Sequence, residues 1–269
     1  PLSAVGRSRP GSALRCARAG GRFPASPWGA PPGRLWASLA GATSQPRGEV
    51  FSSTISPGNA ELNYQPPPGI VAGTGTKGGT QSDLGTQINE KSLRLIGSGM
   101  VVGDRAEAYL RFPAGPQNLL RYGEVRFWAR GNGLGWEEGD FKAYLRLGSD
   151  NRNFYQYLTN AHSGTTAAAW EPEYAVSLDI WRQLRAQVEV RYLQGLPADS
   201  VARVACGGDT VSTAFVACSG PYLVYVSDPG INPPNLAAAQ ELSAGILRVA
   251  ANTPAADAEV WIDDVRLTQ

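Results

Sequence analysis

The sequence has very few of the residues on which catalytic and metal sites most often depend. It contains one histidine, three cysteines and one methionine among 269 residues. A metal site built from three histidines is therefore impossible. The single histidine, His162, lies in a segment of short polar and small residues that is typical of a surface loop, and no serine or cysteine forms a nucleophile motif around it.

Carboxylate pairs do not supply a clearer catalytic site. Glu137-Glu138, and Glu171 with Glu173, offer the two carboxylates that a glycosidase needs. Glutamates in the loops of a protein of this size are usually solvated, however. The sequence therefore favours solvated loop residues over a pair of catalytic carboxylates. We therefore predict that the protein is not an enzyme and has no catalytic cofactor.

Long apolar runs and concentrated charge are also absent. No run of about 18 apolar residues occurs, so no membrane-spanning helix is expected within the chain. The net charge is +1, and the basic residues are either dispersed or gathered near the beginning of the chain. The sequence therefore lacks the cluster of basic residues that would bind the phosphate backbone of a nucleic acid, which argues against a nucleic acid partner.

The beginning of the chain differs in composition from the rest. Residues 1–48 contain seven arginines but no Asp or Glu, and they are rich in Gly, Pro, Ala and Ser, so we expect a disordered leader. Because the sequence starts at Pro1, the leader is read either as part of a fragment or as a stretch that is not authentic coding sequence. Residues 49–90 contain Pro66-Pro67-Pro68-Gly69 and many glycines, which predicts an extended linker.

From residue 91 onward, alternating polarity predicts β-strands. Three segments repeat one design, with an aliphatic face opposite a face that mixes aromatic residues and arginine; they lie at 106–112, 124–130 and 141–147. Further strands are expected near 154–158, 222–227, 242–251 and 259–268. Apolar residues at steps of three and four from Leu178 to Tyr192 predict one amphipathic helix. Residues 91–269 are therefore expected to form an all-β, jelly-roll-like sandwich of two antiparallel sheets with eight or nine strands.

The mixed face of the three repeated strands is the main candidate for a binding surface. Its members share one parity on their strands: Tyr109, Arg111, Arg126, Trp128, Tyr144 and Arg146. If these strands are neighbours, the planar rings and guanidinium groups suit stacking on a sugar or docking of a protein partner. The alternative is that the helix around Trp181 or the proline-rich linker covers this face as ordinary intramolecular packing.

Two other pairs of residues suggest specific chemistry. Cys206 and Cys218 flank a short turn and a strand-like segment, so they either form a disulfide in an oxidising compartment or remain two reduced thiols. Asp263 and Asp264 interrupt the alternation of the last strand, which indicates a β-bulge. Their carboxylates either contribute to a structural calcium site or cap backbone amides and pair with arginine.

Four segments, taken together and in order, resemble part of a known family. These segments are 63–70 (NYQPPPGI), 90–93 (EKSL), 144–150 with 153–155 (YLRLGSD and NFY), and 259–268 (EVWIDDVRLT). The stretch from about residue 60 to residue 269 is similar to a segment of the SprA family, large outer-membrane proteins of gliding motility and type 9 secretion.

The resemblance implies a role and a location that the residues alone do not give. It implies a structural or interaction domain in the cell envelope, associated with the outer membrane, whose partners are other parts of the secretion translocon or secreted proteins. The strand pattern taken by itself is also similar to that of carbohydrate-binding jelly-roll modules, for which the partner would be a glycan. Both functions remain open at this point.

Overall fold

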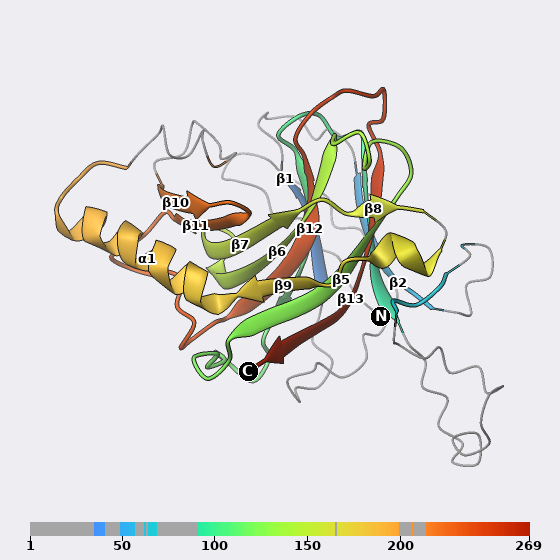
Figure 1. Cartoon of the computed structure of the whole chain (residues 1–269). Coiled ribbons are helices and arrows are strands. Elements are labelled where there is room, and N and C mark those ends of the chain that lie inside the picture. Colours follow the sequence, from blue (N-terminus) through green and yellow to red (C-terminus); the bar gives the residue numbers. More distant parts are fainter. Residues whose placement is uncertain are drawn as a thin grey trace, which may run out of the picture.

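The structure is a computed structural model of the whole chain, and its described part consists of two mostly antiparallel β-sheets and one α-helix (Figure 1). The structure describes residues 49–56, 62, 64–68, 91–164, 166–198, 206 and 214–269, and the backbone of residues 35–40. The rest of the predicted leader and most of the predicted linker lie outside the described residues. The predicted fold class, a two-sheet sandwich with a single helix, is confirmed.

The larger sheet has seven strands, all of them antiparallel to their neighbours. In spatial order they are β1 (Leu35–Ala40), β4 (Arg105–Arg111), β12 (Glu241–Arg248), β6 (Phe141–Asp150), β7 (Asn153–Thr159), β11 (Tyr222–Val226) and β10 (Phe215–Ser219). β12 lies at the centre of the group β4, β12 and β6, and it pairs with both neighbours over most of its length.

The second sheet has six strands. Its main path runs β2 (Glu49–Ile55), β3 (Ser92–Ser98), β13 (Ala258–Thr268), β5 (Glu124–Asn132) and β8 (His162–Ser163), and β9 (Tyr174–Ser177) also pairs with β5. The short β5 and β8 pair is parallel, whereas the other pairs are antiparallel. A 3₁₀ turn at Ala167–Trp170 precedes β9.

The aliphatic faces of the two sheets meet in the core, as the alternation predicts. Phe127 and Val260 of the six-stranded sheet and Leu145 and Ile246 of the seven-stranded sheet are fully buried in one apolar cluster. The face of each sheet that points away from the other sheet is called its outer face below. Because polarity alternates along the strands, the side chains of the opposite parity, among them Trp128, Tyr144 and Arg146, lie on the outer faces.

The helix α1 (Leu178–Leu193) covers the part of the seven-stranded sheet that the second sheet does not reach. It follows β9 directly and packs beside β10 and β11 (Figure 1). Trp181 is fully buried, with its ring next to Tyr155 and Tyr222 and its Nε1 donating to the Gln156 carbonyl at 3.1 Å. The predicted helix is confirmed, and it packs on the inner face of the sheet rather than on the aromatic and arginine face.

The structure contains more strands than the sequence predicts. The described residues form thirteen strands: eleven lie within residues 91–269, where eight or nine were expected, and β1 and β2 belong to segments assigned to the leader and the linker. β1 pairs with the edge of β4, and β2 pairs with β3 over seven residues. Short edge strands are hard to recognise in sequence, because much of their stabilisation comes from backbone hydrogen bonds to a neighbour.

Candidate functional site

The six residues of the predicted binding face lie on two different sheets. Tyr109 and Arg111 are on β4, Tyr144 and Arg146 are on β6, and Arg126 and Trp128 are on β5. Since β5 pairs with β13, β8 and β9, it does not neighbour β4 or β6. The condition for a single patch, that the three strands are neighbours, is therefore not met. The chain crosses from one sheet to the other between β4 and β5 and again between β5 and β6, and the alternation is the same in both sheets.

Arg126 and Trp128 contact other parts of the chain on the outer face of the six-stranded sheet. Arg126 forms ion pairs with Glu124 and Glu173, each at 3.0 Å. The hydrogen bond that it donates to Glu173, followed by the one that it donates to Glu124, raises the pKa of Arg126. Trp128 is half-buried and packs against a cluster that includes Tyr64 of the linker. Trp128 therefore matches the alternative of packing against the proline-rich linker, whereas Arg126 pairs with Glu124 of its own strand and with Glu173, just before β9.

The other four residues share the outer face of the seven-stranded sheet, where they belong to a buried polar row. Strand register places Glu107 and Tyr144 on either side of Gly245, and Tyr109 and Arg146 on either side of Ser243. Glu107 and Arg146 are only 5% and 6% exposed, respectively, and their side chains form an ion pair at 2.7 Å. A buried charge pair of this kind depends on additional hydrogen bonds.

Those hydrogen bonds come from the neighbouring strands. Arg146 Nε donates to Gln156 Oε1 on β7 at 2.8 Å, and the Tyr144 hydroxyl donates to Glu107 Oε2 at 3.2 Å. The Arg146 guanidinium carbon also lies 3.9 Å from the centre of the Phe154 ring and 4.7 Å from that of Tyr144. The arginine is thus fixed on both sides by cation–π contacts and along its edge by hydrogen bonds.

Gly245 provides the space for this arrangement. A Cβ atom at this position would overlap the Tyr144 ring and the Ala106 carbonyl oxygen, so the ring of Tyr144 crosses β12 over the glycine to reach Glu107. Tyr144 is completely buried, and burial, followed by the nearby Glu107 carboxylate, raises the pKa of its hydroxyl. The phenol therefore stays protonated and acts as a hydrogen-bond donor.

A second arginine lies on the same face of β4. Arg105 is half-buried, two residues before Glu107, and it forms no ion pair with any residue that the structure describes. Burial, and then repulsion from Arg146, lowers the pKa of Arg105 to about 10. Arg105 was not among the candidate residues predicted from the sequence, because a sequence does not show which charged side chains have partners.

On the opposite side of the sandwich, the linker is tied to the closing strand. The Tyr64 hydroxyl and the Ser92 hydroxyl lie 2.7 Å apart, and they donate to Asp263 Oδ2 at 3.3 Å and 3.1 Å, respectively. Tyr64 also packs with Trp170 and Trp261, and Trp170 Nε1 donates to the Gln65 carbonyl at 2.8 Å. This group is called the linker cluster below.

The two aspartates of the closing strand are occupied by protein groups. Asp263 Oδ1 accepts from the Asp264 backbone N–H at 2.7 Å, and the Asp264 carboxylate pairs with Arg266. The register shifts between Asp263 and Arg266, which confirms the predicted bulge, and Asp264 has a φ of 46°. Among the residues described, no group of three or more His, Cys, Asp or Glu side chains is arranged to hold a metal ion. These contacts are the ones that the capping and pairing alternative predicts.

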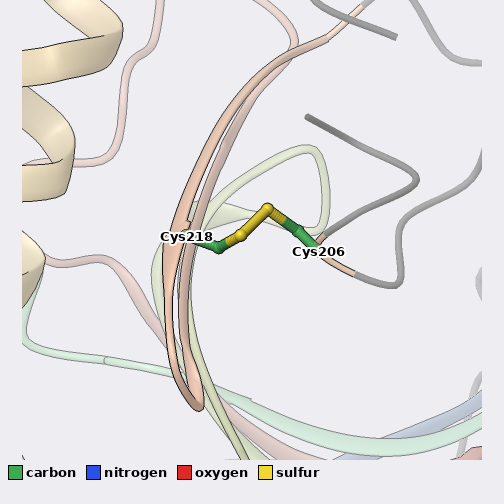
Figure 2. Close-up of a disulfide and its surroundings, with 2 residues drawn as sticks. All are labelled: Cys206 and Cys218. Atoms are coloured by element: carbon green, nitrogen blue, oxygen red, sulfur yellow. A yellow bond between two sulfur atoms is a disulfide. The ribbon is translucent and has the colours of Figure 1, made fainter. Parts of the chain in front are cut away.

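A disulfide joins Cys206 to Cys218, whose Cα atoms are 5.8 Å apart, so the predicted pairing is present (Figure 2). Cys218 belongs to β10, at the end of the seven-stranded sheet that is farthest from β1. Its register through Leu223 and Gln156 places it on the outer face, in the same row as Arg146. The disulfide therefore attaches residue 206 to the face that carries the polar row.

The remaining candidates for catalysis interact with one another and with backbone groups nearby, and His162 belongs to the short strand β8 rather than to the predicted loop. His162 Nδ1 lies 3.3 Å from Glu137 Oε2, and both side chains are 51% exposed. Glu137 also accepts from the Ser163 backbone N–H at 2.8 Å, a hydrogen bond that lowers the pKa of this carboxyl, with a smaller effect from His162. Glu138 accepts from the Gly135 backbone N–H at 2.8 Å.

Comparisons with known proteins do not assign a family. No protein-family model matches the chain, and a search of curated proteins finds no match either. Within the residues that the structure describes, no helix has the length and apolar character needed to cross a membrane.

Proposed function

We propose that the chain is a non-catalytic structural or interaction domain of a SprA-like outer-membrane protein that takes part in type 9 secretion and gliding motility. The observation that carries this proposal is the linker cluster. Tyr64, Ser92 and Asp263 each come from a different segment on which the resemblance rests, and their side chains meet in one hydrogen-bonded group.

The three segments meet in space, which supports a resemblance to SprA at the level of a folded domain rather than of isolated short motifs. Tyr64 and Asp263 are separated by 199 residues in the chain, yet their side chains form a direct hydrogen bond. The fourth segment forms most of β6, in the middle of the other sheet. Short matches that arose by chance would have no reason to meet in space, whereas parts of one cooperative structure do.

A genetic experiment tests the proposal directly. In the organism that carries the gene, residues 91–269 are deleted in frame, and secretion of type 9 cargo and spreading on agar are measured. The deletion should abolish or strongly reduce both. A Leu193→Ala allele is the matched control, because this side chain is 74% exposed and its loss should leave secretion unchanged. Normal secretion after the deletion would contradict the proposal.

A carbohydrate-binding module is the second candidate, and one observation favours it. The outer face of the seven-stranded sheet holds a buried row of charged and amide side chains with aromatic rings beside it, including Glu107, Arg146, Gln156 and Phe154. A sandwich that only needed stability would not require such a row. A reading frame that continues past Gln269 into a hydrolase domain would favour this candidate, and one that continues into many amphipathic barrel strands would favour the first.

A further inference from the structure

Asn132-Gly133 is a dipeptide whose side chain and backbone can react with each other. The side-chain carbonyl carbon of an asparagine can close a five-membered ring with the backbone nitrogen of the next residue. A side chain on that next residue hinders the approach, whereas glycine has no Cβ and lets the backbone come close. Asn132 is the only asparagine in the sequence that is followed by glycine.

The structure leaves this dipeptide open to solvent. Asn132 is the last residue of β5, and Gly133 begins the turn that leads toward β6. Both residues are exposed, and a Cβ atom built at Gly133 would meet no other atom within 4 Å. Within the part of the chain that the structure describes, the Gly133 N–H donates no backbone hydrogen bond. The reacting nitrogen is therefore not held by the neighbouring strand, and the Asn132 amide has room to turn toward it.

Asn132 also belongs to a polar network on the outer face of the six-stranded sheet. Strand register places it opposite Glu259 on β13. The Glu259 carboxylate accepts hydrogen bonds from Arg94 Nε and Nη2, at 2.7 and 2.9 Å, and from Trp261 Nε1. Burial acts to raise the pKa of Glu259, but the hydrogen bonds from Arg94 and Trp261, with a smaller contribution from Asn132, outweigh it and lower this pKa. The Asn132 amide therefore supports a carboxylate that connects β13 to β3.

We propose that Asn132 is a site of spontaneous covalent modification, at which the backbone nitrogen of Gly133 attacks the side chain and converts asparagine to aspartate and isoaspartate. The Gly133 nitrogen loses its proton to solvent and forms a bond to Cγ of Asn132. The bond from Cγ to Nδ2 breaks, and the amide group takes up a proton from solvent and leaves as ammonia. One water molecule then opens the resulting succinimide ring at either carbonyl carbon, and no oxidant, metal or second protein takes part.

The modification changes both the charge and the backbone at the end of β5. Either product carries a carboxylate that the amide lacked, so the formal net charge falls from +1 to zero. The Glu259 carboxylate loses a donor and gains a negative neighbour. In the isoaspartate product the main chain runs through the Cβ carbon, which adds one atom to the backbone at the last pair between β5 and β13. This chemistry is independent of the proposed function and of its alternative.

Two other exposed asparagines provide controls within the same chain. Asn118 is followed by Leu119, and Asn151 is followed by Arg152, so a side chain hinders the attacking nitrogen in both cases. Trypsin, which cleaves after Lys and Arg, should release each of the three asparagines on its own peptide: residues 131–142, 112–121 and 147–152. The three reactions can therefore be followed in one digest.

Peptide mapping of the purified full-length chain, with its disulfide intact, tests the proposal. The folded protein is kept in mildly alkaline buffer at physiological temperature, and samples are digested at intervals. Liquid chromatography with mass spectrometry then separates and identifies the asparagine, aspartate and isoaspartate forms of each peptide. Asn132 should convert at least about tenfold faster than Asn118 and Asn151, which corresponds to a barrier lower by about 1.4 kcal/mol.

Two variants test whether the proposed ring closure is the cause. Asn132→Gln keeps an amide at this position but would need a six-membered ring, so its peptide should stay unmodified over the same period. Gly133→Ala should slow the conversion of Asn132 by about tenfold or more, because the added Cβ hinders the attacking nitrogen. Gly133 has a φ of 98°, which alanine adopts only with strain, so the melting temperature of this variant is measured as well. If Gly133→Ala does not fold, Asn132→Gln and the two control peptides still decide the result.

Three results would each overturn the proposal. The first is an Asn132 peptide that is still unmodified at the end of the incubation. The second is conversion of Asn132 no faster than that of Asn118 and Asn151. The third is modification of the 131–142 peptide in Asn132→Gln at the rate of the parent. None of these results bears on the secretion experiment, so a failure of this modification site and a failure of the SprA-like role are distinguishable.

Discussion

Replacing Tyr64 tests whether the predicted linker is part of the folded domain. Tyr64 is 8% exposed, although the sequence around it is rich in proline and was expected to be an extended linker. Its ring lies 5.6 Å from that of Trp261 and 6.4 Å from that of Trp170, and its hydroxyl donates to Asp263. We expect Tyr64→Ala to destabilise the whole sandwich rather than loosen a tail.

The contacts of Tyr64 divide the expected loss of stability into a contribution from hydrogen bonds and a contribution from packing. Tyr64→Phe removes only the hydroxyl group, whose hydrogen bonds to Ser92 and to the Asp263 carboxylate should contribute about 1 to 2 kcal/mol. Truncation of a buried aromatic side chain to Ala costs about 3 to 5 kcal/mol. Tyr64→Ala should therefore lower the free energy of unfolding by about 3 to 5 kcal/mol, most of it through lost packing.

Chemical denaturation followed by tryptophan fluorescence measures both variants against the parent. Leu193→Ala is the control, because this side chain is 74% exposed and its truncation should change stability by less than about 0.5 kcal/mol. A loss below about 1 kcal/mol for Tyr64→Ala would refute the reasoning. The folded domain would then begin near residue 91, as the composition alone predicts.

One measurement on the parent protein and two substitutions test other parts of the structure. Mass spectrometry of unreduced protein made under oxidising conditions should show Cys206 linked to Cys218; free thiols at both positions would remove the argument for an oxidising compartment. Trp128→Ala should lower the free energy of unfolding by about 1 to 3 kcal/mol in denaturant titration, less than a fully buried tryptophan, because Trp128 is half-buried; a loss above about 4 kcal/mol would contradict this placement. Arg105→Gln should raise stability at pH 7 by about 1 to 3 kcal/mol, because the folded-state pKa of about 10 lies below the usual value of 12.5 and the charged form is therefore penalised. That gain should persist below pH 10 and disappear as the pH rises toward 12.5, and a destabilised Arg105→Gln would show that the charge is compensated.

Alternation in the sequence was sufficient to predict the core but not the sheets. Ala106, Phe127 and Leu145 face the core as their parity predicts, because each strand has one apolar face wherever it lies in the sandwich. The same pattern does not reveal which strands are neighbours. Pairing depends on register and on crossovers between the sheets, and β5 therefore lies in the sheet opposite to β4 and β6.

The polar row was beyond prediction for the same reason. Glu107 alternates with alanine and tyrosine like many solvated glutamates, and only the pairing of β4 and β6 with β12 brings it to Arg146 and Tyr144. Gly245 gave no signal either, because its role is to leave room for a ring from another strand. If the strand pairing had been known, the polar row could have been predicted from the sequence, because the row follows directly from the register.

Arg105 can be compared with a second buried arginine. Arg130, on the outer face of the six-stranded sheet, is 1% exposed, has unpartnered Nε and Nη1 groups among the described residues, and lies 4.4 Å from the centre of the Trp261 ring. Burial lowers its pKa, as it does for Arg105. Arg130 is enclosed beside the linker cluster, so no ligand can reach it, and its stacking on Trp261 accounts for its position.

Arg105 lacks both of these features. Nothing described in the chain stacks on it or pairs with it, it lies close enough to Arg146 to be repelled, and it remains partly exposed. A sandwich selected only for stability would gain from a neutral residue at this position. Glu107, two residues further along β4, opposes the lowering of the Arg105 pKa and so compensates only part of this cost. The two buried arginines therefore differ in what holds them: stacking on Trp261 for Arg130, and the nearby Glu107 carboxylate for Arg105.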